Sequence, residues 1–397
     1  MADESLHPDD GVEELLRARG TEVGPVDDEA DLRAMYRYLL GAGVPFEQLR
    51  AAIERGDQIP GLIEYRLLGE GGRHGVAEVA ASVGLGPEAV VELLCALGIA
   101  VPAPGAATLT DSDLAAVRTF AQVRALFGHE AVLRFARVVR ASISRVAEAA
   151  VAMFGISVED PLRQRGGTRA ELAAVTDRAL NTLPLVPELF AALFQGQALD
   201  AIRRMAILHG ADSTYETVTA SVGFADLVGS TVWSQHRAPR EIADALGEFE
   251  RLAQAALSGR ARLVKTIGDE VMFFAPTPGE ACRTALNLVS AVAGEPRLPA
   301  LRAGLAHGRV VALDGDLYGS VVNLAARLVH QAEPGHVVSD GALADAALAA
   351  QRAAHEAAAQ HNDIAAEVAD LSYTALPPRR LAGFDEPVTP YLVVEAR

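Results

Sequence analysis

Residues 262–275 read Arg-Leu-Val-Lys-Thr-Ile-Gly-Asp-Glu-Val-Met-Phe-Phe-Ala, and this stretch decides the fold of the second half of the chain. Two apolar runs, 262–267 and 270–275, are separated by Gly268-Asp269, a two-residue sequence typical of a β-hairpin turn. A hairpin joins antiparallel strands, whereas consecutive parallel strands need a crossover connection. We therefore predict a mixed or antiparallel sheet here and not a doubly wound parallel one.

Strands and helices alternate on both sides of this hairpin. We predict strands at 217–225, 301–313, 336–339 and 389–394, and helices at 239–257, at 279–293, from about 320 and at 341–370. The region from 217 to 397 is thus an α+β domain with helices flanking its sheet.

The first half of the chain has a different pattern. From residue 31 to 209 the apolar residues recur at helical spacing, so we predict an all-α domain whose last helix runs from about 187 to 209. Residues 1–30 are rich in Asp and Glu and are predicted to be a flexible lead-in. Residues 210–216 are the predicted linker between the two domains.

Residues 76–98 have the pattern of a helix-turn-helix. The surrounding sequence carries no excess of arginine, and a DNA-binding surface needs basic residues. We therefore favour a packing motif over a DNA reader.

Composition excludes several classes of protein. The 397 residues carry a net charge of −17, which argues against broad binding of nucleic acid. The two cysteines, Cys95 and Cys282, form neither a disulfide framework nor a zinc pattern. We find no long uninterrupted apolar run and no basic leader, so we expect a cytoplasmic protein without a transmembrane segment.

The basic residues contain one exception. Lys265 is the only lysine among the 35 basic residues, in a chain that otherwise uses arginine. A lysine retained against such a bias indicates a position where a compact ammonium is needed and a planar guanidinium does not fit. A chance remnant on the surface is the alternative.

Two aspartates are candidates for binding a divalent cation. Asp226 follows an apolar strand and precedes a small-residue loop, while Asp269 lies in the hairpin turn. Two such carboxylates side by side would suit a two-metal site, although each can also be an ordinary turn residue.

A third cluster lies in residues 316–327. Asn323 and Arg327 are four residues apart on a predicted helix and share one face, from which they could grip a sugar and a phosphate or simply be solvated. Asp316, predicted in a loop just before that helix, could accept a hydrogen bond from a base or cap the helix.

Together these motifs resemble the catalytic domain of class III nucleotidyl cyclases. The resemblance covers 217–397 and is carried by Phe-Ala-Asp-Leu-Val-Gly-Ser-Thr (224–231), Lys-Thr-Ile-Gly-Asp-Glu-Val-Met (265–272) and Asp-Leu-Tyr-Gly-Ser-Val-Val-Asn-Leu-Ala-Ala-Arg (316–327). It implies a ferredoxin-like mixed sheet and the conversion of ATP to cyclic AMP and pyrophosphate. Residues 31–209 resemble, more weakly, the autoinhibitory domain of pH-sensing bacterial adenylyl cyclases.

The resemblance assigns a role to each candidate residue. Asp226 and Asp269, with the carbonyl of Leu227, would hold two divalent cations, Mg²⁺ or Mn²⁺. Lys265 and Asp316 would select adenine. Asn323 would orient the ribose, and Arg327 would stabilise the transition state.

The family also implies an assembly, because its sites lie between two catalytic domains. A single chain that holds all six residues is expected to form a head-to-tail homodimer with two complete sites. The more weakly supported contacts to the triphosphate are Ser230, Thr231, Arg379 and Arg380. His209, at the end of the last regulatory helix, is a candidate proton sensor or a residue that stabilises the helix dipole, and a small molecule or lipid could bind the helical domain.

Two rival functions remain at this stage. A guanylyl cyclase is disfavoured by Lys265 and Asp316. A catalytically inactive cyclase fold that serves as a sensor, with 76–98 as its regulatory module, is disfavoured by the complete set of site residues.

Overall fold

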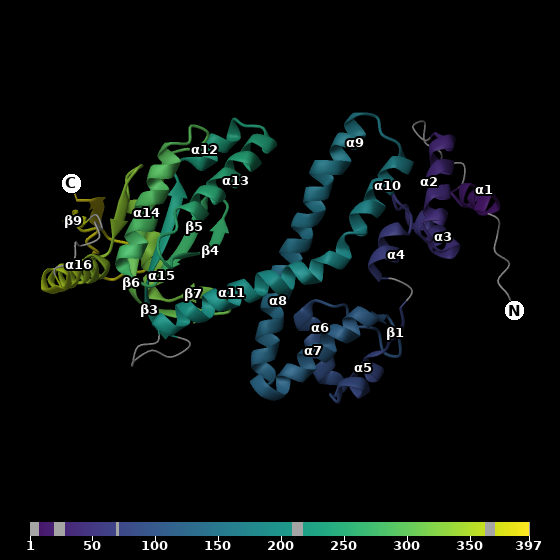
Figure 1. The fold of residues 1–397 in the computed structure, drawn as a ribbon, viewed down its shortest axis with the longest axis horizontal. Helices are drawn as coiled ribbons and strands as arrows, with labels where there is room; N and C mark the ends of the chain where they lie inside the picture. The colour runs from purple at the N-terminus through teal and green to yellow at the C-terminus, as the bar shows by residue number, and fades with distance from the viewer. Residues whose placement is uncertain (1–7, 20–27, 69–70, 209–216, 362–369, 397) are drawn as a thin grey trace. The chain divides into compact units, whose positions relative to one another are not determined.

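The computed structural model describes residues 8–19, 28–68, 71–208, 217–361 and 370–396, which form two compact units (Figure 1). The first unit comprises Met1–Leu193 and the second Phe194–Arg397, so the division falls within helix α11 (Val186–Leu208). The predicted linker 210–216 and His209 lie outside the described residues.

The first unit is helical, as predicted for residues 31–209. Its helices are α1 (Pro8–Ala18), α2 (Glu29–Gly41), α3 (Phe46–Arg55), α4 (Leu62–Leu68), α5 (Val76–Val83), α6 (Pro87–Leu97), α7 (Asp111–Phe127), α8 (His129–Phe154), α9 (Asp160–Gln164) and α10 (Arg169–Leu180). A π-turn, Gly155–Glu159, continues α8 into α9, and a 3₁₀ turn, Leu183–Leu185, precedes α11. Two short strands, β1 (Arg73–His74) and β2 (Leu109–Thr110), pair antiparallel.

The acidic lead-in is a correction to the sequence prediction. Residues 1–30 were expected to be flexible throughout, but Pro8–Ala18 forms α1, in which Val12 and Leu15 are fully buried. They join an apolar cluster with Leu32, Met35 and other residues of α2 and α3. The high Asp and Glu content of the segment concealed two apolar residues at helical spacing.

The predicted helix-turn-helix consists of α5 and α6, whose axes differ by 103°. Val79, Val90 and Leu94 from these two helices are fully buried in a cluster shared with α7 and α8. Glu78, Glu88 and Glu92 are exposed on the same pair. Packing accounts for the apolar pattern, and the exposed carboxylates would repel a phosphate backbone.

One helical segment of the first unit is apolar over a great length. By length and composition His129–Gln164 could cross a membrane, with a mean hydropathy of 1.4 in its most apolar window, and none of that window is buried. The expectation of no transmembrane segment depended on the absence of an uninterrupted apolar run. In this segment scattered charged residues interrupt the apolar ones, although its mean hydropathy is high.

The second unit contains a mixed sheet, as predicted. Its strands are β3 (Thr217–Leu227), β4 (Arg262–Ile267), β5 (Glu270–Ala275), β6 (Leu301–Leu313), β7 (Asp316–Tyr318), β8 (Val337–Ser339), β9 (Leu371–Ala375) and β10 (Tyr391–Glu395). They lie in the order β4-β5-β3-β6-β8-β10-β9, with β7 paired to β6. Among these described strands, β6 and β8 run parallel and the other pairs are antiparallel.

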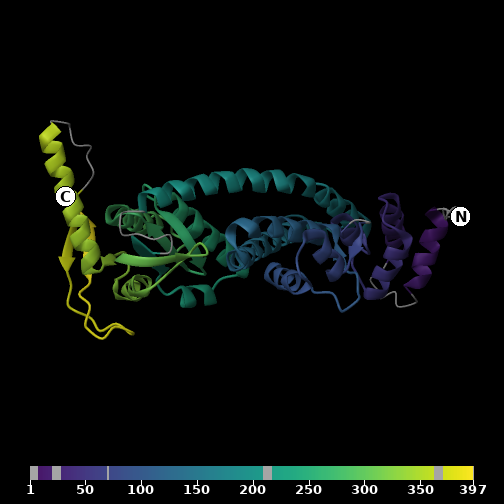
Figure 2. The ribbon, with the colours of Figure 1, turned by 90° about the horizontal axis from the view of Figure 1, so that it is seen from below.

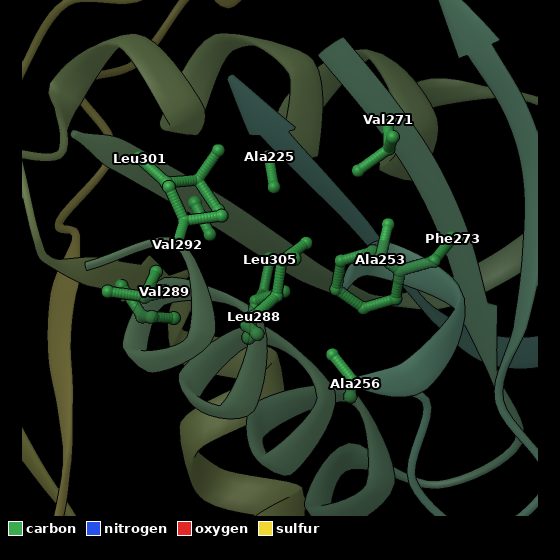
Figure 3. Packing of buried hydrophobic residues seen from close by; sticks show 14 of the residues in the cluster. Ala225, Ala253, Ala256, Val271, Phe273, Leu288, Val289, Val292, Leu301 and Leu305 are labelled. Carbon is green, nitrogen blue, oxygen red and sulfur yellow. The ribbon is translucent and has the colours of Figure 1, made fainter. Parts of the chain in front are cut away.

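Helices cover both faces of this sheet. The helices of the unit are α12 (Ser230–Gln235), α13 (Pro239–Ala255), α14 (Pro278–Ala293), α15 (Ser320–Leu328) and α16 (Gly341–His361), with a 3₁₀ turn, Val329–Gln331, after α15. Figure 3 shows the core on one face, where Phe273 of β5 and Leu305 of β6 lie against Ala253 of α13 and Leu288 of α14. Helix α15 and the 3₁₀ turn after it pack on the other face, with Ala325 and Val329 against Val222 and Met272.

Three elements of the second unit were not predicted. Strands β7 and β9 and helix α12 are short, and each has too few residues for a periodic pattern. Figure 2 shows β9 and β10 in yellow beside α16 at the C-terminal end of the chain. Asp316, predicted in a loop, is the first residue of β7, because the tight turn Asp314-Gly315, with both φ angles positive, folds β7 back onto β6.

Candidate active site

The two predicted metal ligands lie at the same end of the sheet. Asp226 is the penultimate residue of β3, and Asp269 lies in the turn between β4 and β5. The backbone N–H of Leu227 donates to the backbone carbonyl of Asp269 over 3.2 Å, so this pairing of β3 with the hairpin places the two residues next to each other. The hydroxyl of Ser230, the first residue of α12, donates to the Asp269 carboxylate.

An arginine that the sequence analysis did not single out binds the first of these carboxylates. Arg302 on β6 is directly opposite Asp226 in the β3–β6 register. Its Nη2 and Nε donate to Oδ2 of Asp226 over 2.7 and 3.1 Å, and Nη2 also donates to Nδ1 of His330 over 3.0 Å. Only the strand register identifies Arg302, because the chain has many arginines and no motif marks this one.

Negative charge accumulates at this end of the sheet. Glu270 pairs with Asp226 across β3 and β5. Burial, followed by the negative charges of Asp226 and Asp269, raises the pKa of Glu270 to about 7 against the opposing effect of Arg302. A cation bound here would therefore be attracted by several carboxylates.

The donor set fits a hard divalent cation. Carboxylate oxygens are the ligands that Mg²⁺ prefers, and Mg²⁺ is commonly held by one or two carboxylates with the remaining positions taken by water and substrate phosphates. In the described ranges, no group of three or more His, Cys, Asp or Glu side chains is arranged to hold a metal ion. Asp226 and Asp269 are thus suited to a cation that a phosphate also binds.

Lys265 and Asp316 meet although they are 51 residues apart. Lys265 lies on β4 at the edge of the sheet, and Nζ is 2.5 Å from Oδ2 of Asp316 on β7. The β6–β7 hairpin reaches toward β4, where Nη2 of Arg262 donates to the carbonyl of Gly315 over 3.4 Å. Both side chains of the Lys265–Asp316 pair are partly exposed, at 37% and 27%, so a ligand can reach them.

Asn323 and Arg327 lie on α15 and are both exposed. Within the residues that the structure describes, no hydrogen bond or ion pair engages the Asn323 amide or the Arg327 guanidinium. The helix itself is held firmly, because Ala325 and Leu328 are fully buried. The contacts of this chain therefore join Asp226 to Arg302 and Lys265 to Asp316, and leave the two α15 side chains available to another molecule.

The candidate triphosphate residues are dispersed. Thr231 is exposed on α12 beside Ser230, while Arg379 and Arg380 are exposed near the C-terminus. The backbone of Arg379 pairs with Val388. In the part of the chain that is described, no contact joins either arginine to Asp226 or Asp269.

Two family models match the chain, one over each half. The model described as the adenylate cyclase regulatory domain matches residues 22–200, and the adenylate and guanylate cyclase catalytic domain matches residues 212–346.

Individual relatives match over most of their length. An uncharacterized protein of Mycobacterium tuberculosis is 31% identical over 377 residues, which are 92% of this chain and 91% of that protein. An adenylate cyclase of Streptomyces coelicolor is 32% identical over 286 residues, 71% of this chain and 74% of the relative. A pH-sensitive adenylate cyclase of M. tuberculosis is 28% identical over 348 residues, 85% and 84% of the two chains.

Proposed function

The chain belongs to the family of adenylate cyclases in which a regulatory domain precedes a class III catalytic domain, and we propose that it converts ATP to 3′,5′-cyclic AMP and pyrophosphate at sites shared by two copies of the chain. The catalytic domain, 217–397, lies in the second unit. The regulatory domain, 31–209, comprises most of the first unit together with the end of α11, which belongs to the second unit.

The contact between Lys265 and Asp316 is the observation that favours ATP over GTP as the substrate. An ammonium and a carboxylate side by side present a donor and an acceptor to the edge of a base. Adenine offers the complementary pair, an acceptor at N1 and an amino donor at N6, whereas guanine offers a donor at N1 and an acceptor at O6. GTP would therefore place donor against donor and acceptor against acceptor, and the pair favours ATP.

Asp226 and Asp269 bind the phosphate end of the nucleotide through cations. When bound, two divalent cations lower the pKa of the ribose 3′-hydroxyl and neutralise charge on the phosphates. Leu227 adds a backbone carbonyl to this set, and Ser230 holds the carboxylate of Asp269. In the resting chain the Arg302 guanidinium is hydrogen-bonded to Asp226, and a cation that binds this carboxylate would have to displace it.

Asn323 and Arg327 act on the reacting centre from α15. The Asn323 amide hydrogen-bonds the ribose and directs its 3′-hydroxyl in line with the α-phosphorus. The guanidinium of Arg327 faces the α-phosphoryl oxygens, where negative charge develops in the transition state. Ser230, Thr231 and one of Arg379 and Arg380 contact the remaining phosphates.

A homodimer completes each site. The exposed Asn323 and Arg327 have no partner in the described part of their own chain, as expected for side chains that serve a nucleotide held by the aspartates of a second copy. Each copy then gives its aspartates to one site and its α15 residues to the other.

The regulatory domain acts through α11, which ends shortly before β3 and therefore close in sequence to Asp226. A displacement of this helix would separate the halves of the shared site. The similarity to a pH-sensitive relative supports a response to pH, with His209 as one candidate sensor.

The test is cyclic nucleotide production by the full chain with ATP or GTP and Mn²⁺ or Mg²⁺, over a pH series from mildly acidic to mildly alkaline. We expect cyclic AMP from ATP and none in Asp226→Ala. Cyclic GMP as the main product would establish the guanylyl cyclase instead. No product, even from a fragment without the regulatory domain, would establish the inactive sensor.

A further inference from the structure

Strand β4 contains one residue more than the part of β5 with which it pairs. Arg262 lies opposite Phe274, and Lys265 lies opposite Met272. Three steps along β4 thus correspond to two steps along β5, and the register shifts between these pairs. Val264 is therefore the extra residue of a β-bulge, a feature that bends a strand and redirects its side chains.

The bulge places Arg262 and Lys265 on the same face of the sheet. Residues directly opposite each other in an antiparallel pair share a face. Phe274 and Met272, which oppose the two cations, both belong to the apolar cluster that includes Ala325 of α15. In a regular strand two residues separated by three positions lie on opposite faces, because side chains alternate. The bulge thus directs both cations toward the same face.

Both cations contact the hairpin formed by β6 and β7. Nζ of Lys265 is 2.5 Å from Oδ2 of Asp316, the first residue of β7. Nη2 of Arg262 donates to the carbonyl of Gly315, the preceding residue, over 3.4 Å. Nη1 of Arg262 donates over the same distance, 3.4 Å, to the carbonyl of Leu263 on its own strand. One guanidinium therefore joins β4 to the turn from which Asp316 emerges.

The side chain of Arg262 packs on a buried aromatic ring. Its Cζ lies 5.6 Å from the centroid of the Phe274 ring, which is within the range of a cation–π contact. Phe274 is only 3% exposed, so the ring is held by the core. A planar guanidinium packed on such a ring keeps its N–H groups in a fixed direction, and a lysine ammonium has no comparable plane.

The end of the hairpin needs an attachment of this kind. Asp314 and Gly315 form the turn and are both exposed, and β7 pairs with β6 over three residues only. Exposed segments with few packed neighbours open at a small cost in free energy. Because Asp316 follows the turn directly, its distance from Lys265 depends on what holds the turn in place.

We infer that Arg262 is a positioning residue for the selection of the base. Its guanidinium attaches the turn before Asp316 to β4 and thereby keeps that carboxylate beside Lys265. The inference rests on the proposed function, in which this pair selects adenine. Without the attachment, the carboxylate spends part of its time away from Lys265. ATP then loses a contact that matches its base, whereas GTP, which does not match the pair, loses none.

The first test is the ratio of kcat/KM for ATP to kcat/KM for GTP in the full chain. Arg262→Met keeps an unbranched apolar stem on Phe274 and removes the donors, so we expect the ratio to fall about fivefold, as for the loss of one hydrogen bond. Arg262→Lys keeps a charge and a donor and should give an intermediate ratio. Arg309→Met, at an exposed arginine on β6, is the matched control and should leave the ratio unchanged.

The second test reads the position of the pair without turnover. Lys265 is the only lysine of the chain, so labelling with lysine that carries ¹³C at Cε gives one nuclear magnetic resonance signal from this side chain. Asp316→Asn removes the neighbouring charge and defines the shift that loss of the contact produces. Arg262→Met should move the signal in the same direction, and Arg309→Met should not move it. Urea unfolding checks that each variant is folded.

The outcomes distinguish this inference from the proposed function. A signal that moves in Asp316→Asn but stays in place in Arg262→Met would overturn the inference. So would a parallel loss of activity with ATP and GTP in Arg262→Met, because a merely structural role has that result. A signal that moves in both variants while neither changes the nucleotide ratio would confirm that Arg262 holds the pair and would contradict the proposed role of the pair in choosing adenine.

Discussion

Arg302 and Asp226 face each other across β6 and β3, and the guanidinium donates two hydrogen bonds to one carboxylate oxygen, over 2.7 and 3.1 Å. Any cation that binds Asp226 in the absence of nucleotide must compete with this guanidinium. In the resting site the Asp226 carboxylate can therefore bind either the Arg302 guanidinium or a metal cation, but not both at the same oxygen.

Arg302→Gln should tighten the binding of Mn²⁺ to the nucleotide-free chain. The substitution removes a charge-assisted hydrogen bond that the metal must displace, and a release of about 1.4 kcal/mol corresponds to roughly tenfold in affinity. Electron paramagnetic resonance of free Mn²⁺ measures this directly. Arg297→Gln, which breaks the ion pair with Glu295, is the control. Weaker Mn²⁺ binding in Arg302→Gln would show that Arg302 orients Asp226 for the metal and does not compete with it.

Mixing two inactive chains should restore activity if the site is shared. Asp226→Ala removes a metal ligand and Arg327→Ala removes the guanidinium, so in a mixed dimer one of the two sites keeps both. With equal amounts and random pairing, half of the dimers are mixed and each has one intact site, which gives about a quarter of wild-type cyclic AMP production. Activity at the level of the separate chains would indicate that each copy builds its own site.

Much of the catalytic domain could be predicted because its motifs are local. The Gly268-Asp269 turn and the alternation around it predicted a mixed sheet, and the α15 helix followed from spacing. What could not be predicted depends on pairing between distant segments. Arg302 becomes significant only through its register with Asp226, and Asp316 lies on a strand because the turn at Asp314-Gly315 returns the chain onto β6. The burial of Val12 and Leu15 likewise depends on α2, which no local pattern in an acidic segment reveals.

Asp316→Asn should reduce discrimination between ATP and GTP. The amide can rotate to present either a donor or an acceptor, so the mismatch with guanine O6 is relieved while the fold of β7 is kept. Losing one such contact is worth about 1–3 kcal/mol, or roughly 5- to 150-fold in the ratio of kcat/KM for the two nucleotides. Initial rates with each nucleotide give this ratio. Asp314→Asn, in the adjacent turn, should leave it unchanged; an unchanged ratio in Asp316→Asn would remove this residue from base selection.

His74 should make the β1–β2 region of the regulatory domain sensitive to pH. Its Nε2 is 2.6 Å from Asp111 at the start of α7, and its Nδ1 is 2.9 Å from Glu78 on α5. These hydrogen bonds raise the pKa of His74. The hydrogen bond from His74 in turn lowers the pKa of Asp111, and the charge of the neighbouring Arg73 lowers it as well. Because the folded pKa exceeds the unfolded value of about 6.5, the stabilisation is complete below about pH 6.5 and is lost as pH rises through the raised value.

Hydrogen exchange of residues 73–83 at a series of pH values, corrected for intrinsic rates, measures this effect. Protection should fall with rising pH in the wild type and should be flatter in His74→Gln. His129→Gln, which removes a histidine paired with the single carboxylate of Glu92, should keep the wild-type profile in this segment. The idea fails if His74→Gln and the wild type lose protection in parallel.

Gly304→Ala should disable the chain by displacing α15. Gly304 lies on β6 beneath the end of that helix, and a Cβ there would be 2.1 Å from the backbone nitrogen of Val329. Backbone atoms cannot rotate away as a side chain can, so the helix or the strand must shift. Such overpacking typically costs about 1–3 kcal/mol of unfolding free energy. The shift moves Asn323 and Arg327, so we expect kcat for cyclic AMP production to fall more than the affinity for ATP.

Gly294→Ala is the control, because its nearest neighbour would be 3.5 Å away. Urea unfolding and initial rates together decide the matter: a Gly304→Ala chain that is destabilised but fully active would show that the position of α15 is not what limits the reaction.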